Sequence, residues 1–442
     1  MNNQNYRTLI IVISLVIILV VVLTVFLLSR QETVPEPTVT QSAPSSTETK
    51  SNTSSFPTSE NVTSTEKETA PTTQNIIPEI NPTEQEVAVT EEGTIVGEIK
   101  NTADIATGGM TFIEKDRNGT KTTFVRYIEK GTGHIKEIAF DENIPTKVSN
   151  YTILGIVNSL WSKDGSSVVI RRLDGVDNNI QTVYGIIETG SSTSTMPEGE
   201  VGTLNGTILP SNTIDVAVSP QGDRLFYLIK NGDSVTGAVS DFKGTDPFNK
   251  KINIWNSPIS EWQITWPKQD QIMLLTKPAY NVSGILYSLL VPKDNKQEKL
   301  LGDITGLTAI VSNSGKKIIY SETTGSGFMT YILDKQNNEL KVFPAKTLPE
   351  KCVWSKTNEN VVYCGVPKNI IGSKYPDSWY KGIISFNDDI YRIDLDVNSK
   401  RKIVVTGQPD GLDATGLILS TNEDYLSLIN KKDGKIWTIK LK

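Results

Sequence analysis

The sequence predicts an all-β fold, a β-propeller of seven four-stranded blades, with eight blades as the alternative count. A ten-residue pattern recurs six times between Trp161 and Leu428, with starts roughly 45 to 65 residues apart, which leaves room for about four short strands per interval. Each copy has an apolar residue, Ser or Pro, a polar turn and an alternating apolar strand, the signature of a β-hairpin. The copies are WSKDGSSVVI, VSPQGDRLFY, WPKQDQIMLL, VSNSGKKIIY, WSKTNENVVY and LSTNEDYLSL, starting at Trp161, Val218, Trp266, Val311, Trp354 and Leu419.

The segments around the repeats predict the remaining strands. A more polar pair of strands follows several copies, as in TVYGII and MTYILDKQNNELKVF, and Met110 to Ile128 reads as a further hairpin that opens another blade. The last copy is followed by a single strand, Lys435 to Leu441, so one strand is missing from the final blade. Propellers close such a gap with a strand from the other terminus, and the apolar run Thr94 to Ile99 is placed to do this.

The first part of the chain predicts a membrane anchor and a tether. Residues 1–8 form a cytoplasmic N-terminus, and Leu9 to Leu28 is an apolar run broken only by Ser14 and Thr24, about the twenty residues that span a bilayer. We interpret residues 9–28 as an uncleaved transmembrane signal anchor, with a cleaved signal peptide as the alternative. Residues 29–92 are rich in Ser, Thr, Pro and Glu and predict a disordered stalk, which leaves 93–442 for the propeller. The predicted location is the plasma membrane, single-pass, with the propeller on the extracytoplasmic side.

The charge of the chain argues against a nucleic-acid partner. Its formal net charge is −6 and its pI is about 5.2, and no basic block occurs in the predicted propeller. We therefore expect no nucleic acid among its partners.

The repeat resembles that of the TolB-like, WD-repeat-like bacterial propellers, whose blades carry a Trp-Ser-Pro-Asp-Gly type of hairpin. The closest copies are WSKDG at Trp161 and VSPQG at Val218, and the last three copies depart from it at Gly or Asp. With the anchor and stalk, the chain also resembles membrane-anchored propeller proteins of small, uncultivated bacterial lineages, which share runs like TGHIKEI and YPDSWYKG. The resemblance implies a fold and a location. It implies no activity, because a propeller fold does not determine function.

Few residues predict chemistry. His134 is the only histidine, so neither a catalytic triad nor a multi-histidine metal site is expected, and we expect no cofactor. The two cysteines, Cys352 and Cys364, flank the fifth hairpin and lie opposite each other if its turn is centred on Asn358. A disulfide and two buried thiols remain open as interpretations.

Two segments between the predicted strands are longer than the regular spacing of the blades requires. Residues Glu188 to Pro210 are Ser/Thr/Gly-rich and predict a loop, and an insertion runs from Val366 to about Asp389. The insertion is a candidate binding loop, because aromatic residues lead the list of interface hot spots; the alternative is that its rings pack on the blade. The candidate residues are Tyr375, Asp377, Trp379, Tyr380 and Phe386.

These features leave two functions open. The first is a non-enzymatic binding or scaffold module that recognises an unknown protein or a cell-surface glycan, since no catalytic constellation is visible. The alternative is an extracytoplasmic glycoside hydrolase or lyase with paired carboxylates in the central channel.

Overall fold

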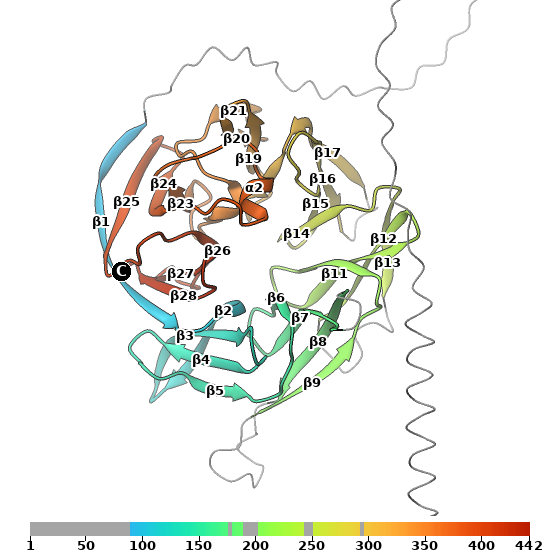
Figure 1. The fold of residues 1–442 in the computed structure, drawn as a ribbon, viewed down its shortest axis with the longest axis vertical. Coiled ribbons are helices and arrows are strands. Elements are labelled where there is room, and N and C mark those ends of the chain that lie inside the picture. Colours follow the sequence, from blue (N-terminus) through green and yellow to red (C-terminus); the bar gives the residue numbers. More distant parts are fainter. Residues whose placement is uncertain (1–88, 176–178, 189–201, 243–250, 292–295) are drawn as a thin grey trace, which may run out of the picture. The chain divides into compact units, whose positions relative to one another are not determined.

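The computed structural model describes residues 89–442 apart from 176–178, 189–201, 243–250 and 292–295. These residues belong to one compact unit, Pro82–Lys442, in which β-sheets stand around a centre in a propeller-like ring (Figure 1). The predicted N-terminus 1–8 and anchor 9–28, and all but the last residues of the predicted stalk 29–92, lie outside the described residues. In the part of the chain that is described, no helix is long and apolar enough to cross a membrane.

Within the described residues, five four-stranded sheets and one eight-stranded sheet build the ring. The first three four-stranded sheets are β2 Thr107–Arg117, β3 Thr120–Glu129, β4 Ile135–Ala139 and β5 Thr146–Ser149; β6 Ile156–Trp161, β7 Ser167–Leu173, β8 Ile180–Glu188 and β9 Thr203–Ile208; and β10 Thr213–Val218, β11 Arg224–Asn231, β12 Ser234–Asp241 and β13 Ile252–Ser257. The next two are β14 Trp262–Lys268, β15 Gln271–Thr276, β16 Ser283–Leu290 and β17 Gln297–Thr305; and β18 Thr308–Val311, β19 Lys317–Thr324, β20 Gly327–Asp334 and β21 Glu339–Val342.

The eight-stranded sheet holds the rest of the chain. It runs in the order β22 Cys352–Trp354, β23 Val361–Pro367, β24 Asp388–Asp394, β25 Ser399–Thr406, β1 Thr90–Ala103, β28 Ile436–Lys440, β27 Tyr425–Asn430 and β26 Ala414–Leu419. Two short helices complete the described elements, the 3-10 helix η1 Pro349–Lys351 and the α-helix α2 Asp377–Tyr380.

The six repeats occupy equivalent places in the ring. The first residue of most copies ends the first strand of its sheet, so that Trp161 pairs with Val168 and Trp354 with Val362. The strands alternate in direction, so the turns of the repeats share one face of the ring. The opposite face carries η1, the 368–387 insertion and the 407–413 connection, and we call it the insertion face.

Packing between adjacent sheets forms the core. The tryptophans in or beside the repeat hairpins belong to this core, since Trp161, Trp262, Trp266 and Trp354 are buried. Trp262 contacts Trp255 of the preceding sheet edge-to-face, with ring centroids 5.4 Å apart, an arrangement that adds to the area each ring buries.

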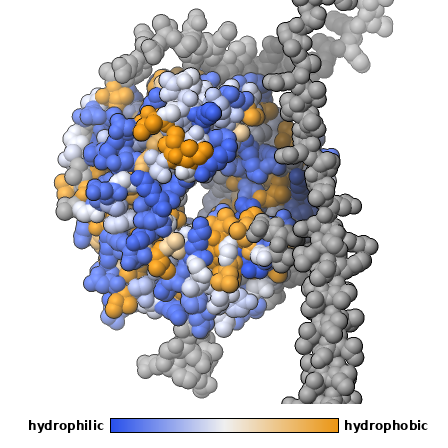
Figure 2. Space-filling model, viewed as in Figure 1, coloured by the Kyte–Doolittle hydropathy of each residue, from blue (hydrophilic) through white to orange (hydrophobic). Residues whose placement is uncertain are grey.

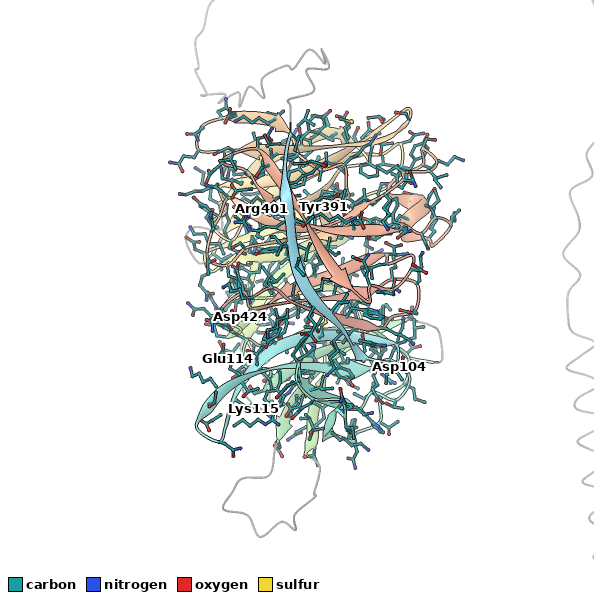
Figure 3. The ribbon with its side chains drawn as sticks, turned by 90° about the vertical axis from the view of Figure 1, so that its left-hand side faces the viewer. Asp104, Glu114, Lys115, Tyr391, Arg401 and Asp424 are labelled. Atoms are coloured by element: carbon teal, nitrogen blue, oxygen red, sulfur yellow. A yellow bond between two sulfur atoms is a disulfide. The ribbon has the colours of Figure 1, made fainter. Side chains whose placement is uncertain are left out.

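Strand β1 closes the ring, as the sequence predicts for its central residues. It pairs antiparallel with β28, with Ile99 opposite Ile439, and parallel with β25, with Ile95 opposite Ile403. The predicted strand Thr94 to Ile99 is too short, because β1 begins at Thr90 and ends at Ala103. Figure 3 shows β1 crossing the outside of the ring beside the strands that carry Tyr391 and Arg401.

The region Glu188 to Pro210 corrects another expectation. It is not all loop, because Thr203–Ile208 forms β9 and pairs antiparallel with β8 over its whole length. Its apolar residue Leu204 is buried against the neighbouring strands, which the Ser/Thr/Gly-rich composition concealed.

Removing β1 should destroy the cooperativity of folding. A chain that begins at Ile105 leaves the edges of β25 and β28 unpaired, and open edges invite association with other chains. We expect aggregation or a broad thermal transition, measured by circular dichroism and light scattering. A chain that begins at Thr90 is the control and should melt cooperatively; equal melting curves for the two chains would contradict the closure.

Candidate functional site

The insertion between β23 and β24 packs down onto the ring through its aromatic side chains. Tyr375, Trp379 and Phe386 are 0, 3 and 2% exposed and form a small core with Phe328 and Leu348. The Tyr375 and Phe386 rings are stacked, with centroids 5.8 Å apart. These three rings therefore pack against the ring of sheets, which agrees with the alternative interpretation of the insertion. The other two candidate residues, Asp377 and Tyr380, are half-buried.

Hydrogen bonds fasten the insertion to two neighbouring sheets and to the far half of its own eight-stranded sheet. Asp377 accepts a bond of 2.6 Å from the Tyr280 amide after β15, and Thr323 of β19 donates one of 2.6 Å to the Tyr375 carbonyl. From the turn after β27, Lys431 donates a bond of 2.8 Å to the Trp379 carbonyl. Several independent attachments over a wide arc of the ring fix the insertion in place.

A charged cluster lies under the insertion. The Lys351 amine is 2.7 Å from an Asp388 oxygen and 2.6 Å from an Asp413 oxygen, and all three side chains are 0% exposed. The Trp379 and Phe386 rings each lie with their centroid 5.0 Å from this amine. Removing the Lys351 amine would leave two buried carboxylates without a counter-ion, which is strongly destabilising.

Two carboxyl groups at the cluster have perturbed titration. Burial raises the pKa of Asp388 to about 6, although Lys351 acts in the opposite direction. Burial also raises the pKa of Glu350, the residue before Lys351, whose carboxylate accepts a hydrogen bond from the Tyr380 hydroxyl. The pKa of Tyr380 rises well above its ordinary value through burial and through Glu350. Clusters of perturbed groups mark candidate functional sites.

A cavity of about 210 Å³ opens beside this cluster, on the same face. Asp389 lies in its wall, 2.7 Å from the Lys402 amine and 3.5 Å from that of Lys368. The hydrogen bond to Asp389 raises the pKa of Lys402. The cavity is lined by Lys368, Asn387, Asp389, Lys402, Ile403, Val405, Gln408, Pro409, Asp410 and Gly411.

The central channel lacks the paired carboxylates that the alternative function required. Figure 2 shows the opening in the ring, and the innermost strands, which are described in full, carry acidic residues at Glu114, Asp116 and Asp215 only. The Asp215 carboxylate has a structural role: it lies 3.1 Å from the Arg171 guanidinium and accepts a 2.9 Å hydrogen bond from the Ile264 amide. Glu114 and Asp116 lie toward the end of β2, near the hairpin turn. The innermost strands therefore supply no pair of carboxyl groups that could act as acid and base in the channel.

The two cysteines lie where the hairpin interpretation places them. Cys352 and Cys364 are directly opposite in the register of β22 and β23, and they form a disulfide with their Cα atoms 4.1 Å apart. The bridge lies one residue from Lys351 and ties the start of β22 to β23.

Among the described residues, no group of three or more His, Cys, Asp or Glu side chains lies close enough together to hold a metal ion. His134 lies beside β4 with its Nδ1 atom 3.9 Å from Glu129. Glu129 also pairs with Lys136 and accepts a hydrogen bond from Thr132. These contacts stabilise the turn between β3 and β4, which accounts for His134 and Glu129 structurally.

The sequence did not point to the residues of this face. Lys351, Asp413, Lys402, Gln408 and Asp410 are widely spaced and match no motif. One signal was available: residues 351, 388 and 413 stand at the starts of β22, β24 and β26, and alternate strands of an antiparallel sheet start at the same edge.

Comparisons with known proteins support the fold. No family description and no curated protein matches the chain. Solved structures similar to it include an oligogalacturonate lyase in complex with manganese, 10% identical with a TM-score of 0.46 over 76% of this chain and 99% of that one. The β-propeller domain of the Trilobed protease from Pyrococcus furiosus is 13% identical, with a TM-score of 0.46 over 75% and 95%. TolB from Acinetobacter baumannii is 10% identical, with a TM-score of 0.40 over 66% and 78%.

These neighbours support the predicted β-propeller and its likeness to TolB at the level of the fold. The expectation of a non-enzymatic binding or scaffold module is not borne out: the similar structures include an oligogalacturonate lyase and a puromycin-hydrolysing peptidase. At such identities the likeness shows the fold alone, so a reaction has to be argued from the residues of this chain.

Truncating the insertion core should cost stability. We expect Trp379→Ala to lower the free energy of unfolding by about 3 to 5 kcal/mol, as for other buried aromatic residues, measured by urea denaturation. The matched control is Ile383→Ala in the same insertion, because Ile383 is 74% exposed and its loss should cost less than about 0.5 kcal/mol. Equal effects of the two changes would refute the packing.

The titration of Asp388 should appear in stability. Since its folded pKa lies above the ordinary 3.8, the native state binds this proton more tightly than the unfolded chain does. The stabilisation is complete below about pH 4 and is lost as the pH rises through about 6, with a span of about 3 kcal/mol.

Asp388→Asn should remove that part of the pH dependence, measured as unfolding free energies between about pH 4 and pH 7. The control is Asp394→Asn on the same strand, where the carboxylate pairs with Arg392; it should keep the pH dependence of the parent. A parent-like slope in Asp388→Asn would count against the titration.

Proposed function

We propose that this protein is an enzyme that cleaves glycosidic bonds, with its active site in the cavity on the insertion face. The observation that carries the proposal is the cavity of about 210 Å³ in which the Asp389 carboxylate is held by the amines of Lys402 and Lys368. The cavity is somewhat smaller than the ~300 Å³ at the low end for ligand pockets, so it suits one polar unit such as a sugar ring.

The lining of the cavity matches the chemistry of a sugar. The amides of Asn387 and Gln408 can donate to and accept from hydroxyl groups, and Pro409 and Val405 supply an apolar wall for a ring face. Hydrogen-bonding groups of this kind fix the orientation of a polar ligand, because a buried hydroxyl without a partner is costly.

Two carboxyl groups of the cavity supply acid and base. We assign Asp389, whose carboxylate accepts a 2.7 Å hydrogen bond from Lys402, as the base or nucleophile. Asp410, from the β25–β26 connection, is the second carboxyl group of the lining, and we assign it the remaining role. Glycoside hydrolysis uses such a pair of carboxyl groups about 5 to 10 Å apart.

We also infer the count of blades and the location. Taking the eight-stranded sheet as two four-stranded halves joined between β25 and β1 gives seven blades, five from the separate sheets and two from the joined one. The apolar run 9–28 and the Cys352–Cys364 disulfide support a membrane-anchored ring in an oxidising, extracytoplasmic compartment. A cell-surface glycan is then the substrate within reach.

The test is turnover of an oligosaccharide panel by the full-length chain. New reducing ends report cleavage, and ultraviolet absorbance of unsaturated products distinguishes a lyase from a hydrolase. Asp389→Asn should lower kcat by about a hundredfold or more, the contribution of a general acid or base. Asp394→Asn on the same strand, outside the cavity, should leave turnover unchanged. The proposal fails if the parent cleaves no member of the panel, or if Asp389→Asn is as active as the parent.

A further inference from the structure

We propose that Lys351, Asp388 and Asp413 are positioning residues for the neighbouring cavity, and that they couple its order, and hence its binding of ligands, to pH. Their effect on catalysis rests on the proposed function. The coupling itself does not, since it concerns only how the cavity wall is held.

Asp388 joins the cavity wall to the buried cluster. Its amide donates a 2.7 Å hydrogen bond to the Leu412 carbonyl, and its carbonyl accepts a 2.9 Å bond from the side chain of Gln408, which lines the cavity. Its carboxylate accepts a 2.7 Å bond from the Ala414 amide. One residue therefore holds the connection 408–414 at three points, while the next residue, Asp389, faces the cavity.

Lys351 and Asp413 hold the same 408–414 connection through the buried cluster. The Lys351 amine has three donors, and it has three acceptors: an Asp388 oxygen at 2.7 Å, an Asp413 oxygen at 2.6 Å and the Ala414 carbonyl at 2.9 Å. The Asp413 carboxylate also accepts bonds of 3.1 Å from the Trp379 indole and from the Phe386 amide. The cluster thus ties the insertion, η1 and the cavity wall together.

The charges of the cluster do not balance. One ammonium faces two carboxylates at 0% exposure, which leaves one negative charge out of water, and a buried net charge is costly. The other groups on the insertion side are Glu350, bonded to Tyr380, and Lys431, bonded to the Trp379 carbonyl. On the cavity side Asp389 is paired with Lys402 and Lys368. Uptake of one proton makes the cluster neutral.

Asp388 is the residue that takes this proton. Both oxygens of Asp413 accept hydrogen bonds, whereas the second oxygen of Asp388, Oδ1, has no partner among the described residues. A proton on Oδ1 therefore breaks no hydrogen bond. It also removes the repulsion between two carboxylates that share one amine. The 408–414 wall is then held more firmly on the acid side of the titration, and the cavity binds its ligand more tightly there.

The test is amide hydrogen exchange of the 408–414 segment in the full-length chain, without a substrate. Rates corrected for intrinsic exchange report local opening. On going from about pH 7 to about pH 5, protection of this segment in the parent should rise about tenfold, the change that one pKa unit of coupling gives. Asp388→Asn should show high protection at both pH values, and Asp394→Asn should behave as the parent.

The outcomes separate this proposal from the proposed function. Protection in the parent that does not change with pH, or a parent-like pH response in Asp388→Asn, would overturn the coupling whatever the turnover assays show. If Asp388→Asn does not fold, the pH response of the parent segment decides. A confirmed coupling together with an inactive glycan panel would leave a pH-sensitive cavity wall and dismiss only the glycosidase.

Discussion

A ring of twisted sheets is stable only when no sheet edge is left open, and in this protein one strand meets that requirement twice. Backbone groups on an open edge are unpaired and template association. Strand β1 pairs antiparallel with β28 over Glu98 to Ala103 and parallel with β25 from Thr90 to Glu98, so it completes one group of strands and joins it to the next. The positions of all the loops on the insertion face depend on this closure, because it fixes how the adjacent sheets meet.

The buried cluster is a consequence of that geometry. Lys351 precedes one inner strand, Asp413 precedes the next, and Asp388 starts the third strand of the sheet between them. The closed ring brings these three strand starts to one face, with the Lys351 amine 2.7 Å from an Asp388 oxygen and 2.6 Å from an Asp413 oxygen. A buried ion pair is tolerated only when its remaining donors and acceptors are satisfied, and here the Ala414 backbone, the Trp379 indole and the Phe386 amide supply most of those partners.

The sequence predicts the local part of this structure well and the long-range part poorly. Each repeat hairpin is specified by residues within one ten-residue window, so its turn and its first residue, a buried tryptophan in three copies, could be read directly, and counting strands indicated the closure. The parallel pairing of β1 with β25 left no sequence signal, because counting strands showed a gap only in the last blade, beside β28, and none beside β25. Strand β9 was concealed by a Ser/Thr/Gly-rich context. The cluster could not be predicted, since Lys351 and Asp413 are 62 residues apart and each looks like an ordinary surface charge.

The aromatic residues of the insertion have a different role from the one that the sequence suggested. Its aromatic residues suggested a surface that contacts a partner, yet Trp379 and Phe386 turn inward and lie over the Lys351 amine. Their rings exclude water from the cluster, and it is the loss of water that raises the pKa of Asp388 into the range where it can respond to pH. The aromatic residues thus act through Asp388 on the wall of a cavity that they do not line. The aromatic residues of the insertion thus influence the site by setting the dielectric environment of Asp388, while Lys368 and Asn387 at the two ends of the insertion line the cavity itself.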